Sequence, residues 1–337
     1  MSPTPSVREN APGAVARALQ RHGGRKDALV QILREVQAET RWLPREALAA
    51  IADGIGLTPA IVEGVAGFYR FFHLRPVGAV HLLWSDNVTD RMQGSRALAR
   101  ELCRRLGVRP GEPVVDGAPA SVGFTSCIGL GDQGPAVLVD QHQVLTRMDE
   151  LRVAELADLI QARTPVADWP VAWTQVEHPV HRADVLLGSP PLRGSALRAA
   201  LARGADATLD EVATSKLRGR GGAGFATAHK WRLCRQAPLP AGATRVVVCN
   251  ADEGEPGTFK DRVLLARQAD TVFEGMTVAA HVLGARRGFV YLRGEYRHLL
   301  DELQTVLARR RDDGLLGRRI LGVDGFDFDV DIHLGAG

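Results

Sequence analysis

The sequence is poor in cysteine and in long apolar runs, and each shortage excludes a class of protein. Its four cysteines, Cys103, Cys127, Cys234 and Cys249, form no CxxC pair, so neither a zinc site nor a redox dithiol is indicated. Such sparse cysteines favour a reducing cytoplasm. No apolar run approaches the roughly 18 residues of a membrane span, and the N-terminus lacks the apolar core of a secretory signal. We therefore expect no membrane span.

Charge of one sign is also lacking. The 42 lysines and arginines nearly balance 39 acidic residues, giving a net charge of +3, which is too small to argue for a nucleic-acid partner. The hydrophobic content of 45% and charged content of 24% are typical of globular protein. A length of 337 residues suggests two ordinary domains.

Lysine is scarce as well, because arginine supplies nearly all of the positive charge. The lysines are Lys26, Lys216, Lys230 and Lys260, and three of them fall within one stretch of the second half. Where arginine is the default cation, clustered lysines indicate a need for a compact point charge, as at a phosphate. Chance clustering is the alternative.

The chain divides into four segments by pattern. Residues 1–75 predict a short disordered start (1–13) and then a small helical bundle, with helices at 26–39, 45–54 and 59–69. Residues 76–165 alternate strands and helices and predict a small α/β module. Residues 166–182 hold two prolines and show no clear period, and they predict a linker or an extended packing segment. Residues 183–337 predict a second α/β domain.

Local signals add detail to this outline. Thr58 is a candidate cap for the third bundle helix, with Pro59 at its first position. Thr208 and Glu211 have the spacing of a capping box. Cys103 falls in an amphipathic helix at 94–107. The predicted strands are 78–84, 121–126, 136–140, 245–250, 288–294 and 326–334.

The predicted second domain contains a glycine-rich loop. Gly219, Gly221, Gly222 and Gly224 could line a phosphate or a flavin with backbone amides, and a helix starting near Ala226 would add positive potential. The stretch fits GxGxxG loosely, but it follows a predicted helix rather than the strand that a dinucleotide fingerprint requires. A tight turn between helices explains the loop equally well.

An acidic stretch follows the strand "RVVVC" (245–249), which is apolar enough to be a buried parallel strand. Asn250, Asp252, Glu253 and Glu255 come directly after it, and ligands of α/β sheets bind at the carboxyl ends of strands. These side chains could accept hydrogen bonds from ribityl or ribose hydroxyls. The alternative is a solvated acidic turn. The residues alone predict a nucleotide or flavin site.

Two long motifs carry a resemblance. "LRGRGGAGFATAHKW" (217–231) and "CNADEGEPGTFKDR" (249–262) resemble the flavin- and NADH-binding subunit of respiratory complex I and its soluble relatives, and the likeness continues through "GFVYLRGEY" (288–296) to "GAG" (335–337). The first 165 residues resemble the small thioredoxin-like partner subunit, notably at "FYRFFHLRPVG" (68–78) and "CIGLGDQGPAVLVD" (127–140). A fusion of both is similar to the diaphorase subunit of NAD-reducing soluble [NiFe] hydrogenases.

The resemblance implies a fold, cofactors and residue roles. The fold is a helical bundle and a thioredoxin-like module followed by an α/β FMN- and NADH-binding domain. Residues 219–224 would lie over FMN, Phe225 near the NADH adenine, and Glu253 and Glu255 at the nucleotide pocket. Hydride would pass directly from NADH to FMN, so no catalytic acid or base is implied. The loop residues are Gly219, Arg220, Gly221, Gly222, Ala223 and Gly224, and the other FMN contacts are Lys230, Asn250 and Asp252.

The iron–sulfur ligands depart from the family pattern. The thioredoxin-like subunit holds a [2Fe–2S] cluster with four cysteines, spaced Cx4C and then Cx3C. Here Cys127 takes the first position of the second pair, its partner position is Gly131, and residues 82–92 contain no cysteine. One thiolate cannot hold such a cluster, so we expect no [2Fe–2S] cluster in residues 1–165. The family's [4Fe–4S] cysteines would lie beyond Gly337, and we expect this stretch alone not to pass electrons onward.

The sequence therefore predicts an NADH:acceptor oxidoreductase (diaphorase) subunit. The implied partners are an iron–sulfur electron-transfer subunit and hydrogenase subunits. Alternatives within the family are the flavin subunit of an NAD-dependent formate dehydrogenase and the NADH dehydrogenase module of complex I. An alternative from another class is a scaffold that binds no flavin.

Overall fold

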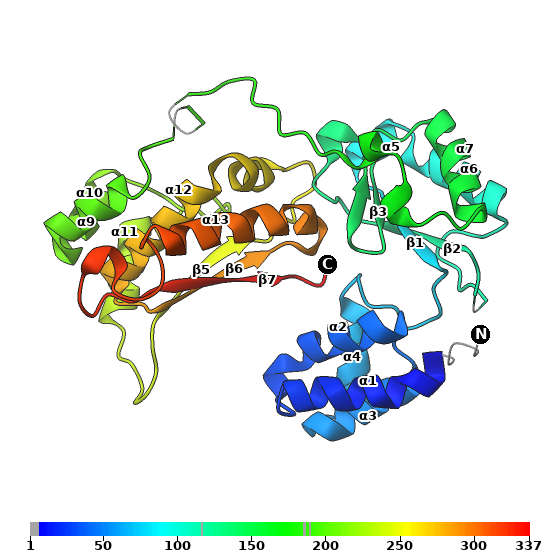
Figure 1. The fold of residues 1–337 in the computed structure, drawn as a ribbon, viewed down its shortest axis with the longest axis horizontal. Coiled ribbons are helices and arrows are strands. Elements are labelled where there is room, and N and C mark those ends of the chain that lie inside the picture. The colour runs from blue at the N-terminus through cyan, green and yellow to red at the C-terminus, as the bar shows by residue number, and fades with distance from the viewer. Residues whose placement is uncertain (1–6, 116, 185–186, 189) are drawn as a thin grey trace. The chain divides into compact units, whose positions relative to one another are not determined.

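The computed structural model describes residues 7–115, 117–184, 187–188 and 190–337, and the chain forms two compact units (Figure 1). The first unit comprises Met1–Glu177, Gly254–Thr258 and Ala336–Gly337, and the second comprises His178–Glu253 and Phe259–Gly335. Both have a mixed helix and sheet composition, so the expected α/β class is confirmed.

A helical bundle begins the first unit. Its helices are α1 (Val7–Arg21), α2 (Leu29–Thr40), α3 (Arg45–Ile55) and α4 (Pro59–Phe68), and the 3-10 turn η1 (Lys26–Ala28) precedes α2. Ile32, Leu33 and Val36 of α2 are fully buried in the core of the bundle. Because these side chains recur at helical spacing, the expected helix over 26–39 was readable from the sequence.

The expected disordered start is wrong from residue 7 onward, where α1 begins. Ala11, Ala14, Val15 and Ala18 form a stripe at helical spacing that is buried in the bundle core. Pro12 lies inside this helix and removes a backbone donor, which is why the local signal argued against a helix. Burial of the stripe outweighs that penalty. Residues 1–6 lie outside the described residues.

The rest of the first unit is built on a sheet with the strand order β2-β1-β3-β4. Strands β1 (Val80–Ser85) and β2 (Ala120–Thr125) are parallel, and β3 (Val137–Val139) and β4 (Gln143–Leu145) form an antiparallel hairpin. Leu82 and Trp84 face a core that also contains side chains of α6 (Ser95–Leu106) and α7 (Glu150–Gln161). Cys103 lies on α6 and is buried, as expected. The short elements α5 (Val88–Met92) and η2 (Gly131–Gln133) lie in the loops.

The first part of the expected linker, residues 166–177, packs against the first unit. It contains the 3-10 turn η3 (Val166–Asp168) and the short helix α8 (Val171–Thr174). Trp169 and Trp173 are buried in the core beneath the sheet. The indole of Trp169 also donates to the carbonyl of Thr164 (3.1 Å). The chain therefore remains attached to the first unit as far as Glu177.

The second unit is a parallel sheet in the order β5-β6-β7 with helices packed on one face (Figure 1). The core joins buried residues of β6 and β7 to α12 and α13, including Phe273, Val290, Leu303 and Val330. The elements are α9 (Ser195–Arg203), α10 (Ala205–Thr214), α11 (Thr227–Gln236), β5 (Val246–Ala251), α12 (Lys260–Leu283), β6 (Arg287–Leu292), η4 (Gly294–Leu299), α13 (Leu300–Asp312), η5 (Ile320–Gly322) and β7 (Asp329–Leu334).

Strand β5 is parallel to β6, as expected, but it is not buried on both faces. Val246 and Val248 are 43% and 58% exposed. The reason is that the described helices pack on the other face of the sheet, and Tyr291 of the central strand β6 is likewise 38% exposed on this face. The expectation of a fully buried strand is therefore wrong, since apolar composition alone does not show how many faces are covered.

Two expected helix caps are absent from the described residues. Pro59 is the first residue of α4, but the side chain of Thr58 makes no capping hydrogen bond. The capping box at Thr208 is wrong, because α10 begins at Ala205 and the Thr208 hydroxyl donates to the carbonyl of Gly204 (2.8 Å) from inside the helix. Because α9 ends at Arg203 and α10 begins directly after Gly204, Thr208 lies inside α10 and cannot cap its start.

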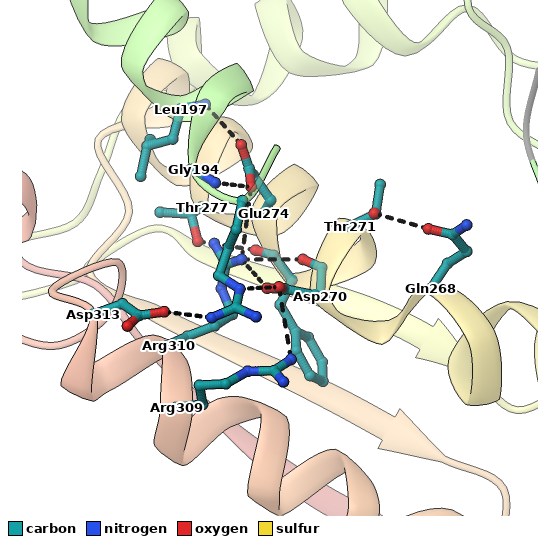
Figure 2. Close-up of polar contacts among 12 residues, drawn as sticks. Gly194, Leu197, Gln268, Asp270, Thr271, Glu274, Thr277, Arg309, Arg310 and Asp313 are labelled. Atoms are coloured by element: carbon teal, nitrogen blue, oxygen red, sulfur yellow. Dashed lines mark hydrogen bonds and ion pairs between the residues drawn. The ribbon is translucent and has the colours of Figure 1, made fainter. Parts of the chain in front are cut away.

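A buried ion-pair network joins the helices of the second unit (Figure 2). The Arg310 side chain on α13 is fully buried and pairs with Asp270 and, at 3.7 Å, with Glu274, both on α12. Glu274 also accepts hydrogen bonds from the amides of Gly194 (2.7 Å) and Leu197 (3.1 Å), at the start of α9. One carboxylate thereby caps α9 and pairs with a buried arginine.

We predict that Glu274→Ala lowers the free energy of unfolding of the second unit by about 2–3 kcal/mol, because it leaves the amides of Gly194 and Leu197 without their acceptor and removes one of the two carboxylates that pair with the buried Arg310. Guanidinium denaturation followed by circular dichroism measures this loss. Glu302→Ala, on the exposed side of α13, is the control and should change stability by less than about 0.5 kcal/mol. Equal effects of the two variants would contradict the role given to Glu274.

Candidate functional site

The glycine loop is closed at its base by backbone pairing. Arg218 and Ala226 form an antiparallel bridge, and the amide of Gly219 donates to the carbonyl of Phe225 (2.8 Å). The guanidinium of Arg218 donates to the carbonyl of Gly224 (3.0 Å). Gly222 has φ +110° and Gly224 has φ +60°, a region that favours glycine. The sequence therefore folds into a defined loop rather than a loose connection.

The face of this loop is open. A Cβ placed on Gly221, Gly222 or Gly224 would meet nothing within 4 Å among the described atoms. Arg220 and Ala223 at the tip are exposed. Open space beside bare backbone is what a planar or phosphorylated ligand requires to approach the amides.

Helix α11 begins directly after the loop, as expected. The side chain of its N-cap residue, Ala226, makes no capping hydrogen bond. The amide of Thr227 donates to the carbonyl of Leu217 (2.9 Å), so an anion would be bound by the amides that follow it. Lys230 lies one turn into α11 and is exposed, and in the described part of the chain it has no hydrogen-bond or ion-pair partner. Phe225 is 45% exposed, with its ring centroid 5.6 Å from that of His229.

The polar side chains at the end of β5 and directly after it have different surroundings. Asn250 and Asp252 are both exposed. The Asn250 Oδ1 accepts a hydrogen bond from the amide of Asp252 (3.0 Å). Among the described residues, no hydrogen bond or ion pair joins either of them to the glycine loop. Glu255 is exposed, and its carbonyl accepts from the amide of Thr258 (3.1 Å).

Glu253 behaves differently from its neighbours, because its side chain is fully buried. Its carboxylate accepts from the amides of Asp261 (3.1 Å) and Arg262 (3.3 Å), the hydroxyl of Tyr296 (2.9 Å) and the ammonium of Lys260 (3.2 Å). Burial alone would raise the pKa of Glu253, but these donors outweigh it and hold the pKa below its ordinary value. The carboxylate anchors the start of α12 instead of facing solvent.

Sequence reasoning missed three residues that complete this network. Arg293 donates to Glu295 (3.0 Å) and to the carbonyl of Glu253 (2.7 Å), and both side chains of the Arg293–Glu295 pair are at most 5% exposed. Burial raises the pKa of Glu295 despite Arg293, and burial followed by the charge of Glu253 raises the pKa of Tyr296. The only available signal was "RGEY" directly after a strand, which places polar residues at the same sheet edge as Asn250.

Residues 82–92, where the resemblance would place the first cysteine pair of a [2Fe–2S] cluster, contain a compact polar network. Ser85 and Asp90 enclose four residues, as the first cysteine pair would, and the Ser85 hydroxyl donates to the Asp90 carboxylate (2.7 Å). Asn87 donates to the same oxygen (2.5 Å), and the amide of Ala136 donates to the other (3.1 Å). Burial raises the pKa of Asp90 against the effect of these donors. Hydrogen bonds therefore satisfy a carboxylate that is only 1% exposed.

The second ligand pair has no room for another cysteine. A Cβ on Gly131 would lie 2.7 Å from the Thr89 hydroxyl oxygen, closer than carbon and oxygen can approach. Cys127 is buried, and its sulfur accepts from the amide of Gly129 (3.4 Å). Within the described residues, no group of three or more His, Cys, Asp or Glu side chains could hold a metal ion. These residues do not fit a [2Fe–2S] cluster.

No single helix of the described residues is long and apolar enough to cross a membrane. The bent pair α3–α4, at 118°, passes that test only by length and composition.

Comparisons with known families match both halves. Residues 15–161 match the thioredoxin-like [2Fe-2S] ferredoxin family, and residues 212–337 match the Nuo51 FMN-binding domain. The order of the two matches is the order expected from the motifs.

Individual relatives match the chain to different extents. It is 40% identical over 332 residues to the NAD-reducing hydrogenase HoxS subunit alpha of Cupriavidus necator, covering 95% of this chain and 54% of that protein. An NADH-quinone oxidoreductase subunit of Rhizobium meliloti is 46% identical over 39% of this chain and 30% of its own length. A crystal structure of NAD+-reducing [NiFe]-hydrogenase in the air-oxidized state has a TM-score of 0.80 and 37% identity, covering 92% of this chain and 51% of that one.

The chain thus spans about half the length of the hydrogenase relatives that it matches. It joins a segment similar to the thioredoxin-like [2Fe-2S] ferredoxin family to a segment similar to the Nuo51 FMN-binding domain, and over 95% of its length it is similar to the alpha subunit of an NAD-reducing hydrogenase.

Proposed function

We propose that the protein is the diaphorase subunit of an NAD-reducing hydrogenase, exchanging hydride between NAD(H) and FMN. The observation that carries this proposal is the similarity over 95% of the chain to the HoxS subunit alpha. The thioredoxin-like and FMN-binding segments lie in one chain, the first before the second. The relatives from NADH-quinone oxidoreductase match a smaller part, from 39% to 42% of the chain. That difference favours a hydrogenase over the complex I alternative.

The second unit fits FMN. The open loop at 219–224 gives a planar ring access to backbone amides, and Lys230 and the uncapped start of α11 supply positive charge for a phosphate. When bound, FMN would supply the exchange between two-electron hydride transfer and single-electron transfer. Asn250 and Asp252 would accept hydrogen bonds from ribityl hydroxyls, and Phe225 would contact the adenine of NADH.

Glu253 takes a positioning role in this proposal. Its carboxylate is fully occupied by Lys260, Tyr296 and the amides of α12, so it holds Asp252 and Asn250 in place rather than contacting the nucleotide itself. Glu255 is exposed and remains available to the nucleotide.

Electrons would leave through partner subunits. We propose that an iron–sulfur electron-transfer subunit and hydrogenase subunits receive them in the cytoplasm, with [4Fe–4S] ligands supplied outside these residues. Residues 1–165 would then be structural, because Cys127 is the one cysteine at the four ligand positions that the resemblance implies, with Gly131 at its partner position and no cysteine in residues 82–92. A formate dehydrogenase assembly and a flavin-free scaffold are the alternatives.

We predict that Lys230→Ala weakens FMN binding about tenfold, since it removes one charge-assisted hydrogen bond to the phosphate. Fluorescence titration of the apoprotein with FMN measures the change. Lys26→Ala, an exposed lysine of the bundle, is the matched control and should leave the affinity unchanged. Unaltered FMN affinity in Lys230→Ala would remove Lys230 from the site.

A second prediction concerns Glu255. Glu255→Gln should raise the KM for NADH about threefold, the effect of one weakened hydrogen bond, without changing FMN content. Asp252→Asn, placed at the flavin, should lower FMN content instead. Steady-state kinetics with an artificial acceptor and flavin quantification separate the two effects. Loss of FMN in Glu255→Gln with normal NADH affinity would refute its placement.

The absence of a [2Fe–2S] cluster from residues 1–165 is a third prediction. After anaerobic reconstitution with iron and sulfide and reduction with dithionite, the protein should show no rhombic [2Fe–2S] EPR signal that depends on Cys127. Cys127→Ser is the comparison, and its spectrum should equal that of the unaltered protein. A near-stoichiometric signal that disappears in Cys127→Ser would overturn the prediction.

A further inference from the structure

A groove of about 300 Å³ in the first unit lies outside the flavin and cluster regions. Its floor is the face of β1 and β2 opposite the main core, where His81 pairs in register with Ser121. The "FYRFFHLRPVG" segment (68–78) forms one wall. The groove exists because β2 carries the small residues Ser121 and Gly123 on this face, whereas Leu138 and Val144 fill the corresponding face of β3 and β4.

The wall segment is fixed in place. Gly78 approaches β2 so closely that a Cβ would lie 2.3 Å from the carbonyl carbon of Ala120, and its amide donates to the Ser121 hydroxyl oxygen (3.1 Å). The carbonyl of Phe71 accepts from both Gln37 and Gln141 (2.6 Å each). The groove is therefore a preformed hollow.

Two arginines give the groove its positive charge. Arg70 crosses Gly123 and donates through Nη2 to the carbonyl of Phe124. The other N–H groups of the Arg70 guanidinium donate to no described residue. Arg75 has no hydrogen-bond or ion-pair partner in the described part of the chain. The acidic residue that lines the groove, Glu112, has Arg109 at 3.6 Å. The fixed charge is thus in excess on the positive side.

Two histidines line the groove in neutral form. Burial, followed by the charges of Arg70 and Arg41, lowers the pKa of His73 to about 4. Burial, His73 and the same arginines lower the pKa of His81 to about 3. The Gln141 amide nitrogen can only donate, so His73 Nε2 accepts from it (3.1 Å) and the ring keeps its proton on Nδ1. His81 Nδ1 shares a hydrogen bond with the Ser121 hydroxyl (2.7 Å).

We propose that this groove binds a small organic anion, a phosphate or carboxylate on an apolar body, with Arg70 and Arg75 as its charged ligands. Guanidinium groups with unused donors match the geometry of such anions. Phe68, Tyr69 and Phe72 supply aromatic surface for the apolar part. Binding of the anion in this groove requires no flavin.

The test is calorimetric titration of the whole chain with phenyl phosphate in the presence of excess FMN. We expect one-to-one binding that weakens about tenfold in Arg70→Gln and in Arg75→Gln. Arg100→Gln removes the same charge from the exposed surface of α6 and should leave the affinity unchanged. Arg75→Gln is informative even if Arg70→Gln does not fold, because in the described part of the chain Arg75 has no hydrogen bond to lose.

Four outcomes would overturn the proposal. The first three are the absence of binding up to about 10 mM, equal affinity in Arg75→Gln and Arg100→Gln, and equal binding of uncharged benzyl alcohol. The Lys230→Ala variant separates this site from the flavin site. Phenyl phosphate should bind it normally, and loss of binding there would place the phosphate in the glycine loop and overturn the proposal as well.

Discussion

The buried carboxylate of Glu253 is the interaction on which the rest of the candidate flavin site depends. It joins the end of β5 to the start of α12 and to Tyr296 after β6, which are elements far apart in the sequence. A carboxylate removed from water is tolerated only when its lone pairs are satisfied. Once Glu253 is held this way, Asn250 and Asp252 are fixed at the edge of the sheet.

A buried carboxylate with satisfied lone pairs also organises loops of the first unit. Asp90 is buried, and Ser85, Asn87 and the amide of Ala136 satisfy its carboxylate. Thr89 occupies the space beside Gly131. Side-chain hydrogen bonds thus hold these loops together.

The pattern of apolar residues was sufficient to predict most elements and their order. The helices at α2, α3, α6 and α12 and the strands at β1 and β6 carry clear periodicity. The glycine loop and the residues after β5 were also readable, because glycine and polar clusters are local signals. Helix α1 was missed because Pro12 and charged neighbours hide a buried stripe.

Contacts between distant residues could not be predicted. Glu253 meets Tyr296 and Arg310 meets Asp270 across more than thirty intervening residues, and nothing local marks either pair. Because of this, sequence reasoning placed Glu253 at the nucleotide when the structure turns it inward. It also could not show that one face of β5 is uncovered, since coverage depends on the neighbours of the strand.

The most direct measurement of the central claim is anaerobic reduction of the FMN-loaded protein by NADH, followed by flavin absorbance. The account predicts that one equivalent of NADH bleaches the bound flavin and that oxidised flavin returns when an acceptor is added. Bound FMN that keeps its oxidised spectrum in the presence of excess NADH would contradict the account, as would a protein that retains no FMN at all.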